Sequence, residues 1–270
     1  MASIGLHDLD RFLRDRARTI EEGIFFFDEP SIHDRFSSDY LSVRKSEGRL
    51  YPDSIVASLP SIQQGHPHAF EWAIRRWTLT KLESYLTRMK DIRSVLDLGC
   101  GNGWMTNALA APDRIVIGCD VVREELEQAS RVFRANSSVR WVYGDLINCA
   151  PPEPFFDLAI AAGSIQYLPS LAEAIRQLLK WLRPWGEVHI VDSPLYASRE
   201  VAGAAERSAI HYRSLSAADF RTHYHHHLLR ELDPFDAAVL YDPSSLLHRL
   251  ERHLGRAVSP FPWIRVRKPA

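Results

Sequence analysis

A turn that carries three alternating glycines is the clearest candidate for chemistry in this sequence. The run Val95–Gly103 reads as an apolar strand that passes through glycines at positions 99, 101 and 103 into a helix from Trp104. Glycine lets the backbone turn sharply and approach a ligand closely. The helix that follows would offer free N–H groups and the positive end of its dipole. We therefore expect this turn to receive a polar or anionic part of a ligand.

The spacing of the glycines disfavours two common nucleotide sites. The dinucleotide pattern GxGxxG fails, because its last position is Trp104 when counted from Gly99 and Thr106 when counted from Gly101. The GK[ST] ending of a phosphate-binding P-loop is also absent from the sequence. Asp97 instead stands on the strand before the glycines, where a carboxylate would repel a pyrophosphate. An acid at this place suits the α-amino group of a methionine moiety.

Two more acids end the next two predicted strands. Asp120 follows Val116–Cys119, at the place of the carboxylate that accepts both ribose hydroxyls in doubly wound sheets. Asp145 follows the strand predicted over 139–143, and a side-chain acid there can accept a hydrogen bond from an adenine amino group. Ligands of open α/β sheets bind outside the carboxyl ends of the strands. The acids therefore predict a site for an amine, a ribose and an adenine in that order.

The elements that must position these residues alternate between strand and helix. Strands are predicted over 93–98, 115–119, 139–143, 156–161 and 187–192, and helices over 104–111, 123–135 and 171–182. This alternation predicts a parallel sheet with helices on both faces and right-handed crossovers. Farther on we expect helices over 217–229 and 245–254, and strands over 236–241 and 263–267, the last one antiparallel at the sheet edge.

The regions that flank this core divide the chain into two parts. Residues 1–66 are broken repeatedly by glycine and proline and predict a cap or lid that lies on something else. Residues 67–90 have helical spacing and lead into the sheet. Phe70, Trp72, Trp77 and Tyr85 are expected to pack against it, although one or two of them could line an acceptor pocket. We expect one domain over 67–270, with an insertion around 194–235 that helps to cover a site.

Residues 93–193 resemble the class I S-adenosylmethionine-dependent methyltransferase family. The matching motifs are Val95–Gly103, Val116–Asp120, Gly144–Leu146, Phe156–Leu168 and Leu182–Asp192. The resemblance implies an α/β fold with a doubly wound, mostly parallel seven-stranded sheet (Rossmann-like), here with a helical N-terminal cap. It also implies that S-adenosyl-L-methionine is the cofactor, and that the end of the fourth strand lies beside the methionine and the methyl group.

The resemblance further implies an enzyme that moves a methyl group to an O, N or C atom of a small-molecule acceptor, such as a sugar or another metabolite. The cofactor-binding residues would be Asp97, Gly99, Cys100, Gly101, Gly103, Asp120, Val121, Asp145, Leu146, Ala162, Gly163 and Gln166. No catalytic residue is assigned, because a base is needed only if the acceptor must lose a proton. Two alternatives stay open: a binding protein of the same fold without methyl transfer, and an oxidoreductase on a doubly wound sheet.

The amino-acid composition restricts the classes of partner and the compartment that we expect. The 33 basic and 34 acidic side chains give a net charge of −1 with no basic stripe, so we expect a small-molecule acceptor and no nucleic acid. No apolar run is long enough to span a bilayer, and no secretory signal is recognisable, so we expect no membrane. The cysteines Cys100, Cys119 and Cys149 show no paired spacing, which favours a reducing cytoplasm. The protein would be a monomer or a homodimer.

Some further side chains are weaker candidates. His223, His225, His226 and His227 invite a metal hypothesis, but only His223 and His227 would share a helix face, and no pattern supplies the other ligands of a zinc site, so no metal is expected. One of them could act as a general base, although exposed polar residues are the simpler interpretation. In the cap, Arg44 is a candidate partner of the cofactor carboxylate, and Tyr40 or Tyr51 could close the site. Tyr167 and Tyr196 follow strands and should edge the pocket.

Overall fold

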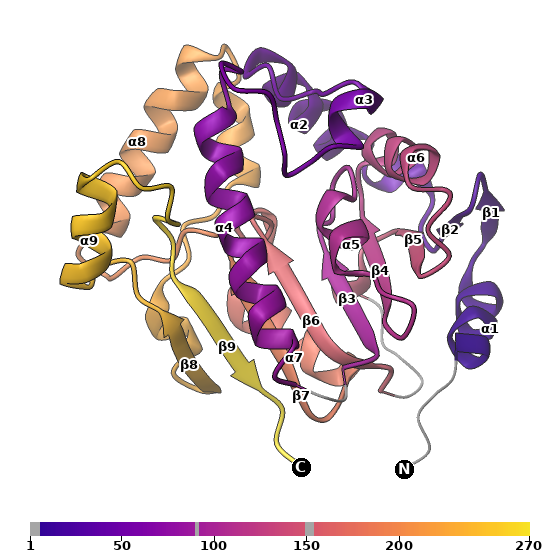
Figure 1. Cartoon of the computed structure of the whole chain (residues 1–270). Coiled ribbons are helices and arrows are strands. Elements are labelled where there is room, and N and C mark those ends of the chain that lie inside the picture. The colour runs from indigo at the N-terminus through magenta and orange to yellow at the C-terminus, as the bar shows by residue number, and fades with distance from the viewer. Residues whose placement is uncertain (1–5, 90–91, 149–153) are drawn as a thin grey trace.

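The structure is a computed structural model that describes residues 6–89, 92–148 and 154–270. Its strands form one sheet in the order β1-β2-β5-β4-β3-β6-β7-β9-β8. Figure 1 shows α4 and α5 in front of this sheet and α7 behind it. Two separate clusters of buried apolar side chains cover the two faces of the sheet. The expected α/β arrangement of a doubly wound sheet between helical layers is therefore confirmed.

Five parallel strands build the centre of the sheet. They are β3 (Ser94–Leu98), β4 (Ile115–Asp120), β5 (Val139–Tyr143), β6 (Phe156–Ala162) and β7 (Leu182–Val191). All of β3 is buried, as expected of a strand covered by helices on both faces. The intervening helices are α5 (Trp104–Leu109), α6 (Arg123–Val132) and α7 (Leu171–Trp181), close to their predicted bounds. The short 3₁₀ turns are η2 (Leu146–Asn148) and η3 (Ile165–Tyr167).

The N-terminal segment corrects the expectation of a purely helical cap on a seven-stranded sheet. Strands β3 to β9 make up the expected seven, but β1 (Thr19–Glu21) and β2 (Ile24–Phe26) form a hairpin that extends the sheet. Strand β2 pairs in parallel with β5 and is fully buried. The sequence prediction missed them because each strand has only three residues, too few for a periodic pattern to be recognised.

The remaining N-terminal elements lie on different sides of the sheet. Helix α1 (Leu6–Arg16) buries Leu9 and Leu13 in the same cluster as α7, whereas α4 (Ala69–Leu86) packs on the opposite face. Between them lie η1 (Pro30–Ile32), α2 (Asp34–Ser46) and α3 (Asp53–Val56). In Figure 1, α2 and α3 sit at the carboxyl ends of the strands, so the part of the segment that can cover a site begins near residue 30.

The C-terminal region departs most from the prediction. Helix α8 (Val201–Ser214) was not predicted, and the helix expected over 217–229 is instead η4 (Ala218–His223), an extended stretch and η5 (Leu229–Leu232). A continuous helix does not form because the N–H groups of His225 and Leu229 donate to the carbonyls of Gln166 and Tyr196. The tertiary partners thus replace the bonds that a helix would need.

The last three elements complete the sheet with one change from expectation. Strand β8 (Asp236–Tyr241), α9 (Leu246–His253) and β9 (Trp263–Arg267) lie close to their predicted bounds. Strand β9 is antiparallel to both β7 and β8, as predicted, but it lies between them, so β8 forms the edge. No helix in the described part of the chain is both long and apolar enough to cross a membrane.

Candidate functional site

The glycine turn after β3 adopts a backbone that requires glycine. Gly99, Gly101 and Gly103 have φ angles of 70°, 53° and 74°, in the left-handed region. A Cβ atom at Gly101 would lie 2.8 Å from Oε2 of Glu125, and one at Gly103 would overlap the ring of Trp141. Both the backbone angles and the close neighbours therefore exclude larger residues. This turn brings main-chain atoms, rather than side chains, to the carboxyl edge of the sheet.

Asp120 ties the glycine turn to the end of β4. Its Oδ2 accepts a hydrogen bond from the N–H of Gly101 at 2.7 Å, and its Oδ1 accepts from the N–H groups of Val121 and Val122 at 2.7 and 2.9 Å. Burial raises the pKa of Asp120, although these three backbone donors oppose the rise. The carboxylate is thus fixed in orientation while it still lines a cavity.

Asp97 has a different environment. It is 1% exposed, and Oγ1 of Thr106 donates to its Oδ2 at 2.7 Å. Burial raises the pKa of Asp97 to about 6, against the effect of the Thr106 hydroxyl. Asp97 does not line either of the two cavities described below. Direct contact between Asp97 and a ligand amine therefore stays a prediction.

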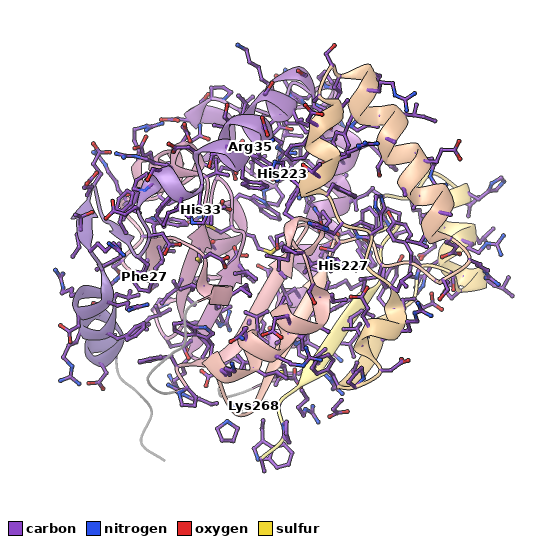
Figure 2. All side chains as sticks on the ribbon, turned by 180° about the vertical axis from the view of Figure 1, so that it is seen from behind. Phe27, His33, Arg35, His223, His227 and Lys268 are labelled. Atoms are coloured by element: carbon purple, nitrogen blue, oxygen red, sulfur yellow. The ribbon has the colours of Figure 1, made fainter. Side chains whose placement is uncertain are left out.

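A cavity of about 220 Å³ lies at the carboxyl ends of β3 to β6. Five of the predicted site residues line it: Gly99, Asp120, Val121, Asp145 and Gly163. Its other wall comes from the N-terminal segment, with His33, Phe36 and Tyr40. In Figure 2, His33 and His223 lie at this end of the strands, whereas Lys268 marks the opposite end. The sequence prediction named Tyr40 and a cap over 1–66 but did not name His33 or Phe36.

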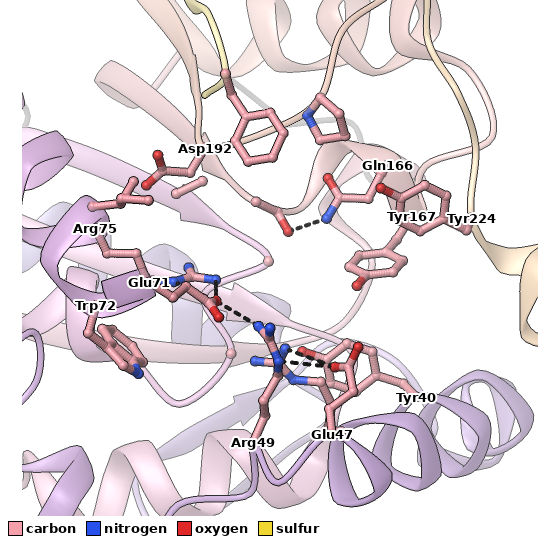
Figure 3. A pocket seen from close by; sticks show the side chains of 18 of the residues that line it. Tyr40, Glu47, Arg49, Glu71, Trp72, Arg75, Gln166, Tyr167, Asp192 and Tyr224 are labelled. Carbon is pink, nitrogen blue, oxygen red and sulfur yellow. Dashed lines mark hydrogen bonds and ion pairs between the residues drawn. The ribbon is translucent and has the colours of Figure 1, made fainter. Parts of the chain in front are cut away.

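A larger cavity of about 620 Å³ adjoins the first. Gly99, Gly163, Tyr40 and Tyr167 line both, so the two spaces share a wall at the ends of β3 and β6. The predicted site residues Cys100, Gly101, Ala162 and Gln166 line the larger cavity. Its remaining wall is rich in aromatic and charged side chains, which include Arg44, Glu47, Arg49, Tyr51, Glu71, Trp72, Arg75, Asp192, His211, Tyr212 and Tyr224 (Figure 3).

The other predicted site residues lie behind these walls. Gly103 begins α5 against Trp141, and Leu146 is buried with its carbonyl bonded to Nε1 of Trp181. Of the aromatic residues expected at the pocket edge, Tyr167 lines both cavities, whereas Tyr196 lines neither of the two described. The structure therefore brings most of the predicted set to one place and assigns a supporting position to the rest.

The cap residues selected from the sequence do reach the larger cavity. Tyr40, Arg44 and Tyr51 all line it, and the guanidinium of Arg44 lies 5.6 Å from the centre of the Tyr40 ring. Nε of Arg44 is buried and has no hydrogen-bond partner among the described residues. Because guanidinium groups bind carboxylates well, this orphan donor fits the role predicted for Arg44.

Glu125 is a site residue that the sequence prediction missed. It lies on α6, is 7% exposed and faces the glycine turn. Burial raises the pKa of Glu125 to about 7, with Arg44 acting against the rise and Asp120 adding to it. The signal in the sequence was an acid on the apolar side of an amphipathic helix, which is rare unless the acid has a partner or a function.

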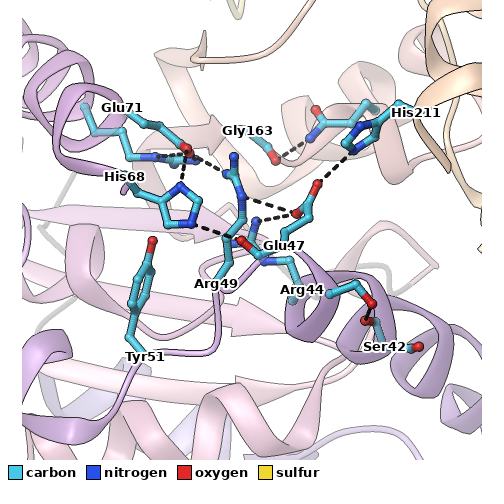
Figure 4. A network of polar contacts seen from close by, with 12 residues as sticks. Ser42, Arg44, Glu47, Arg49, Tyr51, His68, Glu71, Gly163 and His211 are labelled. Atoms are coloured by element: carbon cyan, nitrogen blue, oxygen red, sulfur yellow. Dashed lines mark hydrogen bonds and ion pairs between the residues drawn. The ribbon is translucent and has the colours of Figure 1, made fainter. Parts of the chain in front are cut away.

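A network of ion pairs closes the larger cavity on the side of the cap (Figure 4). Glu71 of α4 accepts from Arg49 at 2.6 Å and from Arg75 at 2.9 Å. Glu47 pairs with Arg49 at 3.3 Å and with His211 of α8 at 2.9 Å. Burial alone would raise the pKa of Glu71, but the two arginines lower it. The network joins α4 and α8 to the end of α2, so three segments distant in sequence form one wall.

The four histidines of the insertion do not converge. His223 pairs with Asp39, His226 with the hydroxyl of Ser208, and His227 with the carbonyl of Ile165. The expected shared helix face of His223 and His227 does not exist, because the chain is extended from Tyr224 onward. Within residues 6–89, 92–148 and 154–270, no group of three or more His, Cys, Asp or Glu residues is arranged to hold a metal.

The cysteines add no reactive group at the site. Cys100 and Cys119 are free and buried, and burial raises the pKa of both thiols well above the usual range. A buried neutral thiol behaves as a small apolar side chain. Cys149 lies outside the described residues.

Comparisons with known proteins agree with this geometry. A family model described as a methyltransferase domain matches residues 95–186. The chain is 27% identical over 140 residues to the malonyl-[acyl-carrier protein] O-methyltransferase of Halalkalibacterium halodurans, covering 45% of this chain and 51% of that one. It is 32% identical over 126 residues to the 27-O-demethylrifamycin SV methyltransferase of Amycolatopsis mediterranei, covering 44% and 46%. The chain thus spans about half the length of the curated relatives it matches.

A solved structure extends the likeness in fold beyond the matched core. The plantazolicin methyltransferase BpumL, in complex with SAH, aligns with a TM-score of 0.53 at 16% identity and covers 89% of this chain and 98% of that one. The fold and the site together define a Rossmann-like methyltransferase domain. Residues 95–186, the core of the chain, are therefore similar to class I S-adenosylmethionine-dependent methyltransferases.

Proposed function

We propose that this protein is an S-adenosylmethionine-dependent methyltransferase that acts on an O, N or C atom of a small-molecule acceptor. The observation that carries the proposal is the pair of adjoining cavities that meet at Gly99 and Gly163. One cavity is bordered by the strand-end acids, and the other has an aromatic wall. A cofactor bound in the first could present its reactive end to an acceptor in the second.

The residues present fit the proposed cofactor on grounds of shape and charge. Gly99 and Gly101 of the glycine turn line the cavities, so their main chain can contact a ligand. Asp120 is held in place by three backbone N–H groups and lines the smaller cavity, where its oxygens can accept from ribose hydroxyls. The unpartnered Nε of Arg44 fits the carboxylate of the methionine moiety.

We assign the contacts as follows. Asp120, Val121 and Asp145 would hold the adenosine part, whereas Gly99, Cys100, Gly101, Ala162, Gly163, Gln166 and Arg44 would hold the methionine part. Leu146, which is buried and lines neither cavity, would support the adenosine part from behind the wall. Asp97 and Gly103 would shape the turn from behind. When bound, the cofactor supplies a methyl group on a positively charged sulfur atom.

The contribution of the chain is binding, orientation and exclusion of water. Alignment of two reactants in a closed pocket can lower a barrier by up to about 7–11 kcal/mol. We propose that the N-terminal segment 1–66 and the insertion 194–235 form the cover, on a domain that spans 67–270. The ion pairs of Glu47 and Glu71 support this division, because they hold α2, α4 and α8 against one another over the cavity.

The test measures cofactor binding and methyl transfer separately. Calorimetry with S-adenosylmethionine and S-adenosylhomocysteine should show binding of both, and a panel of small acceptors should yield S-adenosylhomocysteine. Binding without turnover on any acceptor would favour a binding protein of the same fold. Binding of a nicotinamide cofactor in place of S-adenosylmethionine would contradict the proposal.

Replacement of Asp120 gives a residue-level test. Asp120→Ala should weaken S-adenosylhomocysteine binding by at least about tenfold, because hydrogen bonds to a charged group contribute about 1.5–3 kcal/mol. Asp113→Ala is the matched control, since this exposed acid lies just before the other end of β4. Equal affinities for the two variants would remove the ribose assignment.

The proposal also covers partners and location. The near-neutral charge of the chain supports a small acceptor over nucleic acid. We propose that the protein is a monomer or a homodimer. The free thiols of Cys100 and Cys119 are compatible with the reducing conditions of the cytoplasm.

A further inference from the structure

The larger cavity contains an acid that the cofactor proposal does not use. Asp192 directly follows β7 and has a φ of 48°, a left-handed conformation that aspartate tolerates better than most residues. Oγ1 of Thr78 and Oγ of Ser259 donate to its Oδ1 at 2.7 and 3.1 Å. Its Oδ2 is buried and accepts no hydrogen bond from the described residues. One oxygen is therefore anchored, and the other is left for a ligand.

A second unpartnered acceptor lines the same cavity. Oε1 of Gln166 is buried without a partner, while its Nε2 donates to the carbonyl of Gly163. The amide cannot be reversed without loss of that bond, because a carbonyl only accepts. Figure 3 shows Asp192 and Gln166 along the same border of the cavity. A buried acceptor without a donor costs about 1–3 kcal/mol, so both oxygens favour a ligand with N–H or O–H groups.

Three of the four arginines that line the cavity are engaged by acids, and the fourth, Arg207, is exposed. Arg49 and Arg75 both donate to Glu71, and Arg49 also pairs with Glu47. Arg44 lies 3.9 Å from Glu47, and its remaining donor is assigned to the cofactor. Apart from the exposed Arg207, the cavity therefore offers a carboxylate acceptor little unpaired positive charge, whereas it offers a donor group two unpaired oxygens.

Asp192 also lies at the junction where transfer would occur. The N–H of Gly163 donates to the carbonyl of Val191 at 3.0 Å and to Oγ of Ser193 at 3.1 Å. A Cβ atom at Gly163 would lie 3.4 Å from the carbonyl oxygen of Asp192. Since Gly163 belongs to the wall shared by both cavities, Asp192 borders that wall from the acceptor side.

We propose that Asp192 binds an N–H or O–H group of the acceptor through Oδ2 and takes its proton as that atom is methylated. This inference rests on the proposed function. The lone pair of the acceptor nitrogen or oxygen forms the bond to the methyl carbon, and the bond from that carbon to sulfur breaks with its electrons left on sulfur. The proton of the acceptor passes to Oδ2 and then to solvent.

The surroundings of Asp192 suit a proton acceptor. Burial raises the pKa of Asp192, while Arg75 and the hydroxyls of Thr78 and Ser259 lower it and Glu71 adds to the rise; the net shift is upward. A base with a raised pKa holds a transferred proton better. The reaction needs the ionised form, so kcat should rise with pH through this raised pKa.

The aromatic wall of the larger cavity indicates the shape of the acceptor. Trp72, Tyr167, Tyr212 and Tyr224 line the cavity together with Phe261. Such side chains favour a flat, apolar body. The inferred acceptor is an amine, alcohol or phenol carried on an aromatic or similarly apolar small molecule.

The first test compares probes that differ only in the reacting group. Benzylamine, benzyl alcohol, phenol and benzoate are titrated into protein saturated with S-adenosylhomocysteine and followed by ligand-observed NMR. Wild type should bind at least one N–H or O–H probe about tenfold more tightly than benzoate. Asp192→Asn should lose that preference. If benzoate binds as well as all the others, the inference is overturned.

The second test uses turnover with the best acceptor from a panel of aromatic amines, alcohols, phenols and carboxylic acids. Asp192→Asn should lower kcat by about 10²-fold or more, the usual contribution of a positioned base, and should remove the rise of kcat with pH. Asp242→Asn is the control, because this exposed acid also directly follows a strand. If Asp192→Asn matches Asp242→Asn in kcat and pH profile, or if only carboxylic acids are methylated, Asp192 is not the base.

A milder variant keeps the test valid if Asp192→Asn folds poorly. Thr78→Val removes one donor to Oδ1 and leaves the carboxylate in place. Loss of that hydrogen bond disfavours the ionised form, so the pH profile of kcat should move to higher pH. An unchanged profile would contradict the proposal. Failure of S-adenosylhomocysteine to bind wild type would instead overturn the proposed function, so the two failures are distinguishable.

Discussion

The two adjoining cavities are built in different ways. The smaller one is bordered mainly by strand ends and by the glycine turn, with one wall from the N-terminal segment. The larger one is walled by side chains from α2, α4, α8 and the segment before β9. A cavity bordered by strand ends allows little change in the identity of a few glycines and acids. A space made of side chains from distant segments can differ between relatives while the sheet stays the same.

The largest effect is expected when a side chain is placed in the glycine turn. Gly103→Ala should lower the free energy of unfolding by about 3 kcal/mol, because it adds left-handed strain and overlap with Trp141. Gly255→Ala is a matched control, since both glycines have a φ of 74° but nothing lies within 4 Å at Gly255. Chemical denaturation of both variants measures the difference, and equal losses would show that strain alone matters.

A second variant tests whether the buried Asp97 is protonated in the folded protein, unlike an acid such as Asp120 that binds a ligand at the cavity. The pKa of Asp97 in the folded protein is about 6, above its ordinary value of 3.8, so the folded state binds more protons between these values. The free energy of unfolding should therefore fall as pH rises through this window, by about 3 kcal/mol in total from this one group. Asp97→Asn should lack that loss, and the variant should gain stability over wild type toward pH 7.

Urea denaturation from pH 4.5 to 7.5 measures this effect. The difference between Asp97→Asn and wild type should grow with pH and then become constant above pH 6. A difference that does not depend on pH would mean that Asp97 is ionised in the folded state, as direct pairing with an amine would require.

The smallest expected effect tests whether Arg44 belongs to the cofactor side. Arg44→Met should weaken S-adenosylhomocysteine binding by about tenfold, because a charge-assisted hydrogen bond is lost. Methylthioadenosine, which lacks the amino-acid carboxylate, should bind wild type and variant equally in the same calorimetric assay. Arg207→Met serves as the control at an exposed position of the wall. Equal weakening of both ligands would assign Arg44 to the shape of the cavity instead.

The same contrast explains what could be predicted from the sequence. Asp120, Gly99 and Gly163 were found because each stands in a contiguous motif at the end of a predicted strand. Glu125 was missed, since only the fold brings the buried side of α6 against the glycine turn. The residue Asp192 was part of a recognised motif, yet its anchoring by Thr78 and Ser259 depends on elements far away in the chain.

The fold prediction failed where the hydrophobic periodicity was weak, or where hydrogen bonds to distant segments replaced the local hydrogen bonds of a helix. Strands β1 and β2 are too short to show alternation, although Ile24–Phe26 is fully buried. Helix α8 buries only Ala204 and Tyr212 along 14 residues, so it has almost no apolar stripe to recognise. The segment 224–228 was predicted as part of a helix, but its backbone forms hydrogen bonds with the backbone of Gln166 and Tyr196 instead.

One feature of the wall has a consequence for how such proteins diversify. Helix α8 lends Arg207, Ser208, His211 and Tyr212 to the larger cavity, and no described residue of α8 lines the smaller one. Helix α2, by contrast, gives Tyr40 to both. The sequence of α8 can therefore change during evolution with little effect on cofactor affinity. A chimera that carries the α8 of a relative should change its acceptor selectivity and keep its affinity for the cofactor.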